Sequence, residues 1–168
     1  MENKNFIHED DTQLRNWVKE NVLTKAVDVK FYEDRYTPFD LEYTTKTGKK
    51  RYMEIKNRHF SHDKYTTTDI SLHKFSLLDE RDDVDLCVCF DDGILFYNSK
   101  DIKKNFSHIG HHVAADEYNY TWSVKDKKFA CFDIDETKFF PYDIFSSSPT
   151  REIIPSKFNL INDEEGNN

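Results

Sequence analysis

PFDLEYTTKTGKKRYMEIKNR, residues 38–58, contains two strand-like segments joined by a short polar turn. Apolar and polar residues alternate over residues 39–44 and again over residues 51–56, which is the period of a β-strand whose two faces differ. The intervening TKTGK, residues 45–49, carries the glycine that is typical of a hairpin turn. This stretch therefore predicts an antiparallel hairpin.

Charged residues stand at unusual positions on this hairpin. Strand alternation places Asp40 and Glu42 on one face of the first strand, and Tyr52, Glu54 and Lys56 on one face of the second. If these faces coincide, Asp40, Glu54 and Lys56 converge. Two adjacent carboxylates repel, which raises the pKa of one of them unless a cation lies between them. The alternative interpretation is an exposed hairpin whose acids and bases simply pair across the strands.

A divalent metal ion would supply that cation. Hard oxygen ligands favour Mg²⁺ or Mn²⁺, and Mg²⁺ commonly keeps waters and binds a substrate phosphate oxygen. A neighbouring lysine can orient or deprotonate the attacking water, or offset charge on the phosphorane. The acids and the lysine of this hairpin could therefore hold a divalent cation and act on a phosphate group bound to it.

The segments around the hairpin predict a single α/β domain over residues 1–161. The expected elements are a helix over residues 11–23 capped by Asp10 or Asp11, a strand over 27–31, the hairpin, a helix over 69–78 capped by Thr68 or Asp69, and strands over 84–90 and 94–97. Beyond them we expect a helical turn over 101–106, strands over 122–124 and 128–133, loop and short helix over 134–155, and a disordered tail over 162–168.

This arrangement resembles the PD-(D/E)XK nuclease superfamily, which has the restriction-endonuclease-like fold and includes type II restriction enzymes, Holliday-junction resolvases and small phage nucleases. Its motif is an Asp at the start of the second core strand, then Glu or Asp, any residue, and Lys on the third strand. Asp40 matches the first acid, and Glu54-Ile55-Lys56 match the second element. Pro38 lies two residues before Asp40 instead of one. The resemblance covers residues 9–98.

The resemblance implies a mixed sheet flanked by helices and a metal-dependent nuclease, most readily a DNA endonuclease, acting by in-line attack of a metal-bound water. Asp40, Glu54 and Lys56 would be the catalytic residues. Mg²⁺ or Mn²⁺ would be held by Asp40, Glu54 and an acid of the first helix, for which Asp10 is the first candidate. The competing acids of that helix are Glu9, Asp11 and Glu20.

The formal net charge of −8 excludes a general attraction for nucleic acid. Residues 46–64 carry seven bases and two acids, a net +5, which leaves −13 for the remainder, so an anionic partner is expected to bind locally. The expected nucleic-acid contacts are Lys49, Lys50, Arg51, Arg58, Lys64 and Lys74, the last on the helix after the third strand. The alternative is a catalytically idle nuclease fold whose acidic surface binds a protein partner or mimics DNA.

Further features set the expected context. Cys87 and Cys89 alternate within an apolar run and are expected to be buried thiols, and with Cys131 they form no clear zinc motif.

No signal peptide or membrane-spanning run is visible, so we expect no membrane partner and a reducing cytoplasm. The Lys- and Asn-rich composition indicates an AT-rich genome, such as that of a phage or a low-GC bacterium. A small nuclease without a second binding domain is expected to form a homodimer or to act with a protein partner.

Two other motifs are set aside. Asp133-Ile-Asp135-Glu-Thr137 resembles the first motif of haloacid-dehalogenase phosphatases, but the 31 residues after Thr137 are expected to be too few for the rest of that fold. The histidines and acids of SHIGHHVAADE, residues 107–117, match no known zinc spacing, and Gly110 favours a solvated loop there.

Overall fold

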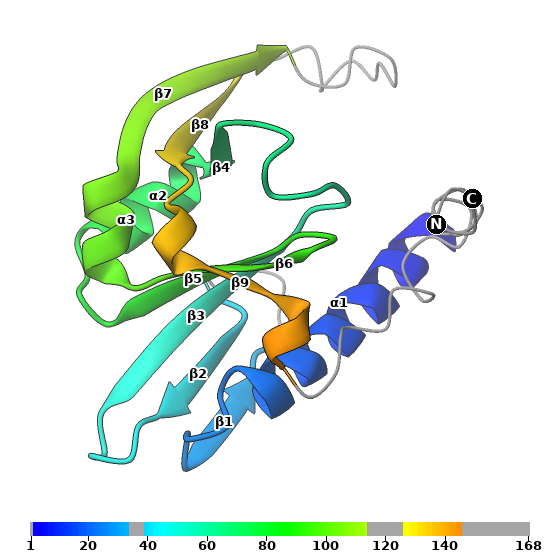
Figure 1. The fold of residues 1–168 in the computed structure, drawn as a ribbon, viewed down its shortest axis with the longest axis vertical. Coiled ribbons are helices and arrows are strands. Elements are labelled where there is room, and N and C mark those ends of the chain that lie inside the picture. Colours follow the sequence, from blue (N-terminus) through cyan, green and yellow to red (C-terminus); the bar gives the residue numbers. More distant parts are fainter. Residues whose placement is uncertain (1, 34–38, 114–125, 146–168) are drawn as a thin grey trace.

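The computed structural model describes the backbone of residues 2–33, 39–113 and 126–145, and side chains at 12–33, 39–110 and 128–145. Within these ranges the chain forms two β-sheets, three α-helices and two short 3₁₀ helices. The larger sheet lies between α1 on one side and α2, α3 and the smaller sheet on the other (Figure 1).

The larger sheet has six strands in the order β1-β2-β3-β5-β6-β9. They are β1 (Asp28–Phe31), β2 (Leu41–Thr44), β3 (Lys50–Asn57), β5 (Val84–Cys89), β6 (Gly93–Tyr97) and β9 (Phe139–Pro141). Only the β3–β5 pair is parallel, and the other pairs are antiparallel. The predicted class, an α/β domain with a mixed sheet flanked by helices, is confirmed, and so is the hairpin, which is β2–β3.

Parallel strands need a crossover connection, and α2 (Leu72–Asp79) lies in the connection between β3 and β5. All six residues of β5 are buried, because both faces of the sheet are covered at this point. Leu86 and Val88 face the smaller sheet, whereas Cys87 and Cys89 face α1. The prediction of buried, unbridged thiols is therefore confirmed.

Helix α1 (Glu2–Asn21) packs on the sheet through an apolar stripe that includes Leu14, Trp17 and Val18. The helix begins well before residue 11, so the predicted cap at Asp10 or Asp11 is wrong. Residues 2–9 contain neither glycine nor proline, and nothing in their sequence breaks the helix. The acids at positions 9–11 therefore lie inside the helix.

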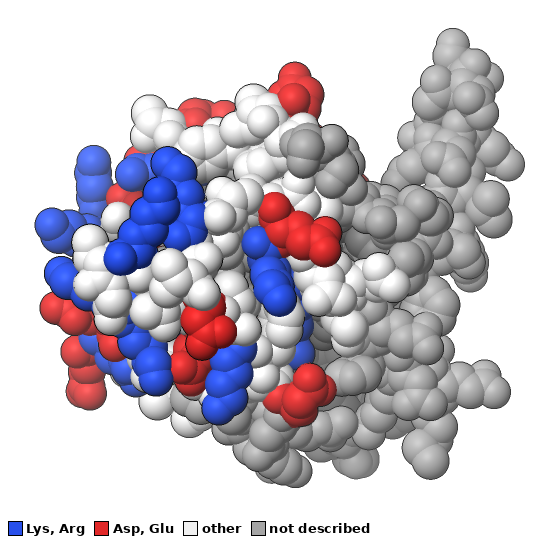
Figure 2. Space-filling view, turned by 90° about the horizontal axis from the view of Figure 1, so that it is seen from below, with Lys and Arg blue, Asp and Glu red and all other residues white. Residues whose placement is uncertain are grey.

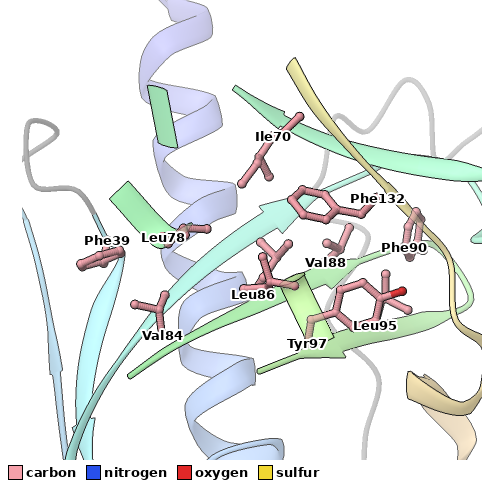
Figure 3. Packing of buried hydrophobic residues seen from close by; sticks show 12 residues of the cluster. Phe39, Ile70, Leu78, Val84, Leu86, Val88, Phe90, Leu95, Tyr97 and Phe132 are labelled. Atoms are coloured by element: carbon pink, nitrogen blue, oxygen red, sulfur yellow. The ribbon is translucent and has the colours of Figure 1, made fainter. Parts of the chain in front are cut away.

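The smaller sheet has three strands in the order β4-β8-β7. They are β4 (Thr67–Ser71), β8 (Asp126–Asp133) and β7 (Phe106–Val113), and β7 directly follows helix α3 (Ser99–Asn105). Ile70 of β4 and Phe132 of β8 lie above Leu86 and Val88 of the larger sheet, so the two sheets share one core (Figure 3).

Two predictions fail in this smaller sheet. The expected helix over residues 69–78 begins only at Leu72, where Ser71 caps it by accepting a hydrogen bond from the backbone N of Lys74. The histidine-rich segment over residues 107–117 was expected to be a loop, but its residues 107–113 belong to strand β7, in which Gly110 pairs with Phe129. Strands β4 and β7 both owe their conformation to pairing with β8. The predicted strand over residues 122–124 and the tail over 162–168 lie outside the described residues.

The phosphatase-like motif has a structural role. Asp133 ends β8, and Asp135 caps the 3₁₀ helix η2 (Glu136–Lys138). Its Oδ1 atom accepts hydrogen bonds from the backbone N and the hydroxyl of Thr137. The second 3₁₀ helix, η3 (Tyr142–Ile144), follows β9. The Asp-x-Asp-x-Thr pattern is therefore explained by a helix cap.

Candidate active site where β2 and β3 diverge

The position of Asp40 follows from the unequal lengths of two strands. Strand β2 begins at Leu41, opposite Met53, whereas β3 continues to Asn57. The backbone N of Asp40 donates to the carbonyl of Met53 at 3.0 Å, and Oδ2 of Asp40 accepts from the backbone N of Ile55 at 2.7 Å. The carboxylate thus satisfies an amide of β3 beyond the start of β2, and it is held beside β3.

The acid of β3, Glu54, is buried on the face that points toward α2. Its side chain is only 4% exposed, with Nζ of Lys56 3.3 Å from Oε2 and Nζ of Lys74 3.2 Å from Oε1. Burial and the nearby charge of Asp40 raise the pKa of Glu54, and the two ammonium groups act in the opposite direction. Glu54 is thus a desolvated carboxylate beside a second acid.

Arg15 of α1 completes this cluster, and the sequence analysis did not identify it. Its Nη2 lies 2.7 Å from Oδ1 of Asp40, and its Nη1 donates to the carbonyl of Tyr32 at 3.3 Å. No local pattern distinguishes Arg15 from the other polar residues of α1, because its partner is 25 positions away. The contact depends on how α1 lies across the sheet.

All four carboxylate oxygens of Asp40 and Glu54 have a partner within the protein. Three cations, Arg15, Lys56 and Lys74, face these two acids, so the cluster carries a formal charge of +1. The three basic side chains are 20% to 28% exposed. Solvent-accessible cations around a buried carboxylate can bind an incoming anion such as a phosphate.

The metal ligand predicted on the first helix lies outside the described side chains. Asp10 lies within α1, but its side chain is outside the described residues, as are those of Glu9 and Asp11. Glu20 is exposed near the C-terminal end of α1. The described part of the site therefore contains two acids, Asp40 and Glu54.

Five of the six predicted nucleic-acid contacts separate into two groups. Lys74 joins the site, and Arg58 and Lys64 follow β3 on the same side of the larger sheet. Lys49 and Lys50 lie at the opposite end of the hairpin, where Lys50 pairs with Glu42 at 3.0 Å.

Arg51 belongs to neither group, because it lies on the other face of β3. Its Nη2 is 2.7 Å from Oδ1 of Asp85, an acid of β5 whose side chain is 2% exposed. The hydroxyl of Tyr43 donates to the same carboxylate at 2.5 Å. The geometry gives Arg51 a structural role as the counter-charge of a buried acid.

The distribution of charged side chains on the surface favours local binding of an anion, because the surface is not uniformly basic. On the face drawn in Figure 2, Lys and Arg side chains gather toward one side, and acidic side chains are interspersed among them. This distribution agrees with the net charge of −8 over the chain.

A second polar cluster surrounds His62, which no sequence motif had marked. Its Nδ1 lies 2.5 Å from Oδ2 of Asp92 and its Nε2 lies 2.9 Å from Oε1 of Glu136, while the ring stacks on Phe139 at 3.6 Å. Partial burial lowers the pKa of His62, but the two carboxylates outweigh it and the pKa is raised. His62, Asp63 and Asp92 are close enough together to hold a metal ion. A ring with both nitrogens donating to carboxylates, however, offers a metal no lone pair.

Comparison with known proteins adds no relative from which a function can be transferred. The chain matches no family model, no curated protein and no solved structure. Within the described ranges, no helix is long and apolar enough to cross a membrane.

Proposed function

We propose that this chain is a metal-dependent phosphodiesterase that cleaves nucleic acid, with DNA as the first candidate substrate. The observation that carries the proposal is the convergence of Asp40, Glu54 and Lys56 where β2 and β3 diverge. The order of helix, antiparallel strands, crossover helix and parallel strand also supports a resemblance to the PD-(D/E)XK superfamily.

The donor set fits a hard divalent cation. Asp40 and Glu54 offer carboxylate oxygens, which suit Mg²⁺ or Mn²⁺, and an acid of α1 such as Asp10 would add a third ligand. The raised pKa of Glu54 reflects a charge that is buried beside another acid, and a cation at this position would relieve that repulsion. When bound, such an ion would lower the pKa of a coordinated water and neutralise charge on a phosphate.

The basic residues would bind and orient the substrate. Lys56 and Lys74 each place an ammonium group near a different oxygen of Glu54, at the partly exposed edge of the site. From there either lysine can donate to a phosphate oxygen, and Lys56 can also orient a water for in-line attack. Arg15 touches no reacting atom in this scheme, and it positions the carboxylate of Asp40.

One observation favours the second candidate, a catalytically idle scaffold that binds a protein partner. The four oxygens of Asp40 and Glu54 are already satisfied by Arg15, Lys56, Lys74 and the amide of Ile55, without any metal. An ion-pair cluster of this kind is complete as it stands. We favour the enzyme because a divalent cation can take the place of the two ammonium groups on Glu54. The ammonium groups of Lys56 and Lys74 can then pair with a phosphate, so that the added positive and negative charges balance.

A cleavage assay on a mixed substrate panel tests the proposal. Supercoiled plasmid, linear duplex, single strand, four-way junction and RNA are incubated with the wild type and Glu54→Ala in Mg²⁺, Mn²⁺ or EDTA. Cleavage that requires metal and is lost in Glu54→Ala supports the enzyme. If no substrate is cut, or if the variant cuts equally well, the proposal fails and the idle scaffold takes its place.

A further inference from the structure

A hollow of about 650 Å³ is bordered by Arg58, which lies two residues after Lys56 of the candidate active site. Its walls come from the segment after β3 and from one face of the smaller sheet, and they include Arg58, Phe60, Tyr65, Thr67 and His108. The active-site cluster described above does not use this hollow.

Strand β3 connects the hollow with the site. Glu54, Lys56 and Arg58 stand at every second position, so their side chains lie on one side of the strand. The backbone N of Arg58 extends the parallel ladder by donating to the carbonyl of Cys89 at 2.8 Å. At about 3.3 Å per residue, Arg58 lies about 13 Å from Glu54 along the strand. Its Nη2 donates to the carbonyl of Asp69 at 2.7 Å, which fixes the guanidinium at the edge of the hollow.

An exposed aromatic ring forms part of the wall. Tyr65 is 54% exposed, although its ring packs edge-on against Phe60 at 5.2 Å, and Phe60 in turn contacts Phe90 at 6.0 Å. The ammonium group of Lys64 lies over both rings, 5.6 Å from the centroid of Phe60 and 5.5 Å from that of Tyr65. An accessible ring with a cation beside it is a combination that binds unpaired bases together with their phosphates.

We propose that this hollow binds an unpaired base of single-stranded nucleic acid, with the base on Tyr65 and the backbone running past Arg58 and Lys56 toward Glu54. Lys64 then moves from the ring faces to a phosphate. The bases of an intact duplex are stacked on each other and cannot reach Tyr65. The site consequently prefers a substrate with a single-stranded segment. This inference deepens the proposed function and rests on it.

Fluorescence anisotropy of the full chain in EDTA tests this binding without cleavage. The probes are fluorescein-labelled oligothymidine, oligouridine and a blunt DNA duplex, and the two single strands distinguish DNA from RNA. We expect the wild type to bind a single strand more tightly than the duplex, and Tyr65→Ala to weaken that binding roughly tenfold. Tyr65→Phe keeps the ring and retains the affinity, and Val27→Ala, a change at another exposed side chain, has no effect.

The inference is overturned if Tyr65→Ala binds single strands as the wild type does while keeping its thermal stability, or if the wild type prefers the duplex. It is also overturned if the wild type binds none of the probes. Failure of the proposed function has a different signature: binding then depends on Tyr65, but no substrate is cut in Mg²⁺ or Mn²⁺. Conversely, Glu54-dependent cleavage that is indifferent to Tyr65 rejects the base-binding hollow alone.

Discussion

Arg15 of α1 places its guanidinium 2.7 Å from the carboxylate of Asp40, at the point where the hairpin strands separate. The helix covers the opposite face of the sheet from Glu54, yet the side chain of Arg15 reaches Asp40 at the edge where the acids lie. The packing of α1 and the orientation of Asp40 are therefore coupled.

Replacing Arg15 should affect catalysis through the orientation of Asp40. We expect Arg15→Ala to lower kcat by about tenfold with a smaller change in KM, because the residue contacts Asp40 and not the substrate. Arg15→Lys should recover part of the loss, because it restores the charge. The free energy of unfolding should fall by about 1 kcal/mol in Arg15→Ala, as for a largely buried ion pair with one added hydrogen bond, in which desolvation offsets part of the attraction. An equal loss of kcat in both variants would contradict a positioning role.

Glu54 should make stability depend on pH in an unusual direction. Its pKa in the folded state is raised above the ordinary value of 4.5, so the folded chain holds the proton to higher pH than the unfolded chain does. Protonated Glu54 favours folding, and this contribution declines as pH rises from 4.5 through the folded-state pKa. Urea unfolding across this range should show the decline in the wild type and not in Glu54→Gln. If the free energy of unfolding depended on pH in the same way in the two proteins, the assignment of this decline to Glu54 would be contradicted.

His62 should act as a pH-dependent link between the segment after β3 and the β5–β6 turn. Its raised pKa means that the stabilisation from Asp92 and Glu136 is complete below the ordinary value of 6.5 and is lost as pH rises through the folded-state pKa. The melting temperature should therefore fall over this interval in the wild type. His62→Gln should lack this step, whereas a change at the exposed His73 should keep it. An NMR titration of the His62 ring measures the shift directly.

Two isoleucines on the smaller sheet give a matched test of how it packs. Ile70 of β4 is 1% exposed in the core between the two sheets, whereas Ile109 of β7 is 48% exposed. Ile70→Ala should cost about 2–5 kcal/mol of unfolding free energy, and Ile109→Ala less than about 0.5 kcal/mol. Similar costs at both positions would mean that β4 does not seal the shared core.

The elements that were predicted from the sequence are those with local signals. Strand β5 is one apolar run, the β2–β3 hairpin has its alternation and its Gly48, and the core stripe of α1 repeats at helical spacing. Gly48 has a φ of +86°, in the left-handed region where a side chain would be strained. In each case neighbouring residues determine the structure.

The elements that were missed depend on distant partners. Ile70 is part of a strand because it pairs with Ala130, sixty positions later. The helical spacing of the residues that follow Ile70 led to the prediction of a helix, because the sequence alone does not show that pairing. Gly110 lies in a strand for the same reason, since it pairs with Phe129. Likewise, the alternation rule brought Asp40, Glu54 and Lys56 together, but it could not reveal Arg15, whose contact arises only when α1 docks.

Cleavage of supercoiled plasmid by the wild type, by Glu54→Gln and by the exposed control Glu80→Gln, each in Mg²⁺ and in EDTA, tests the central claim most directly. The proposed mechanism predicts metal-dependent nicking by the wild type and Glu80→Gln, and a loss of at least about a hundredfold in Glu54→Gln. Nicking that persists in EDTA, or that survives in purified Glu54→Gln, would contradict a catalytic site where β2 and β3 diverge.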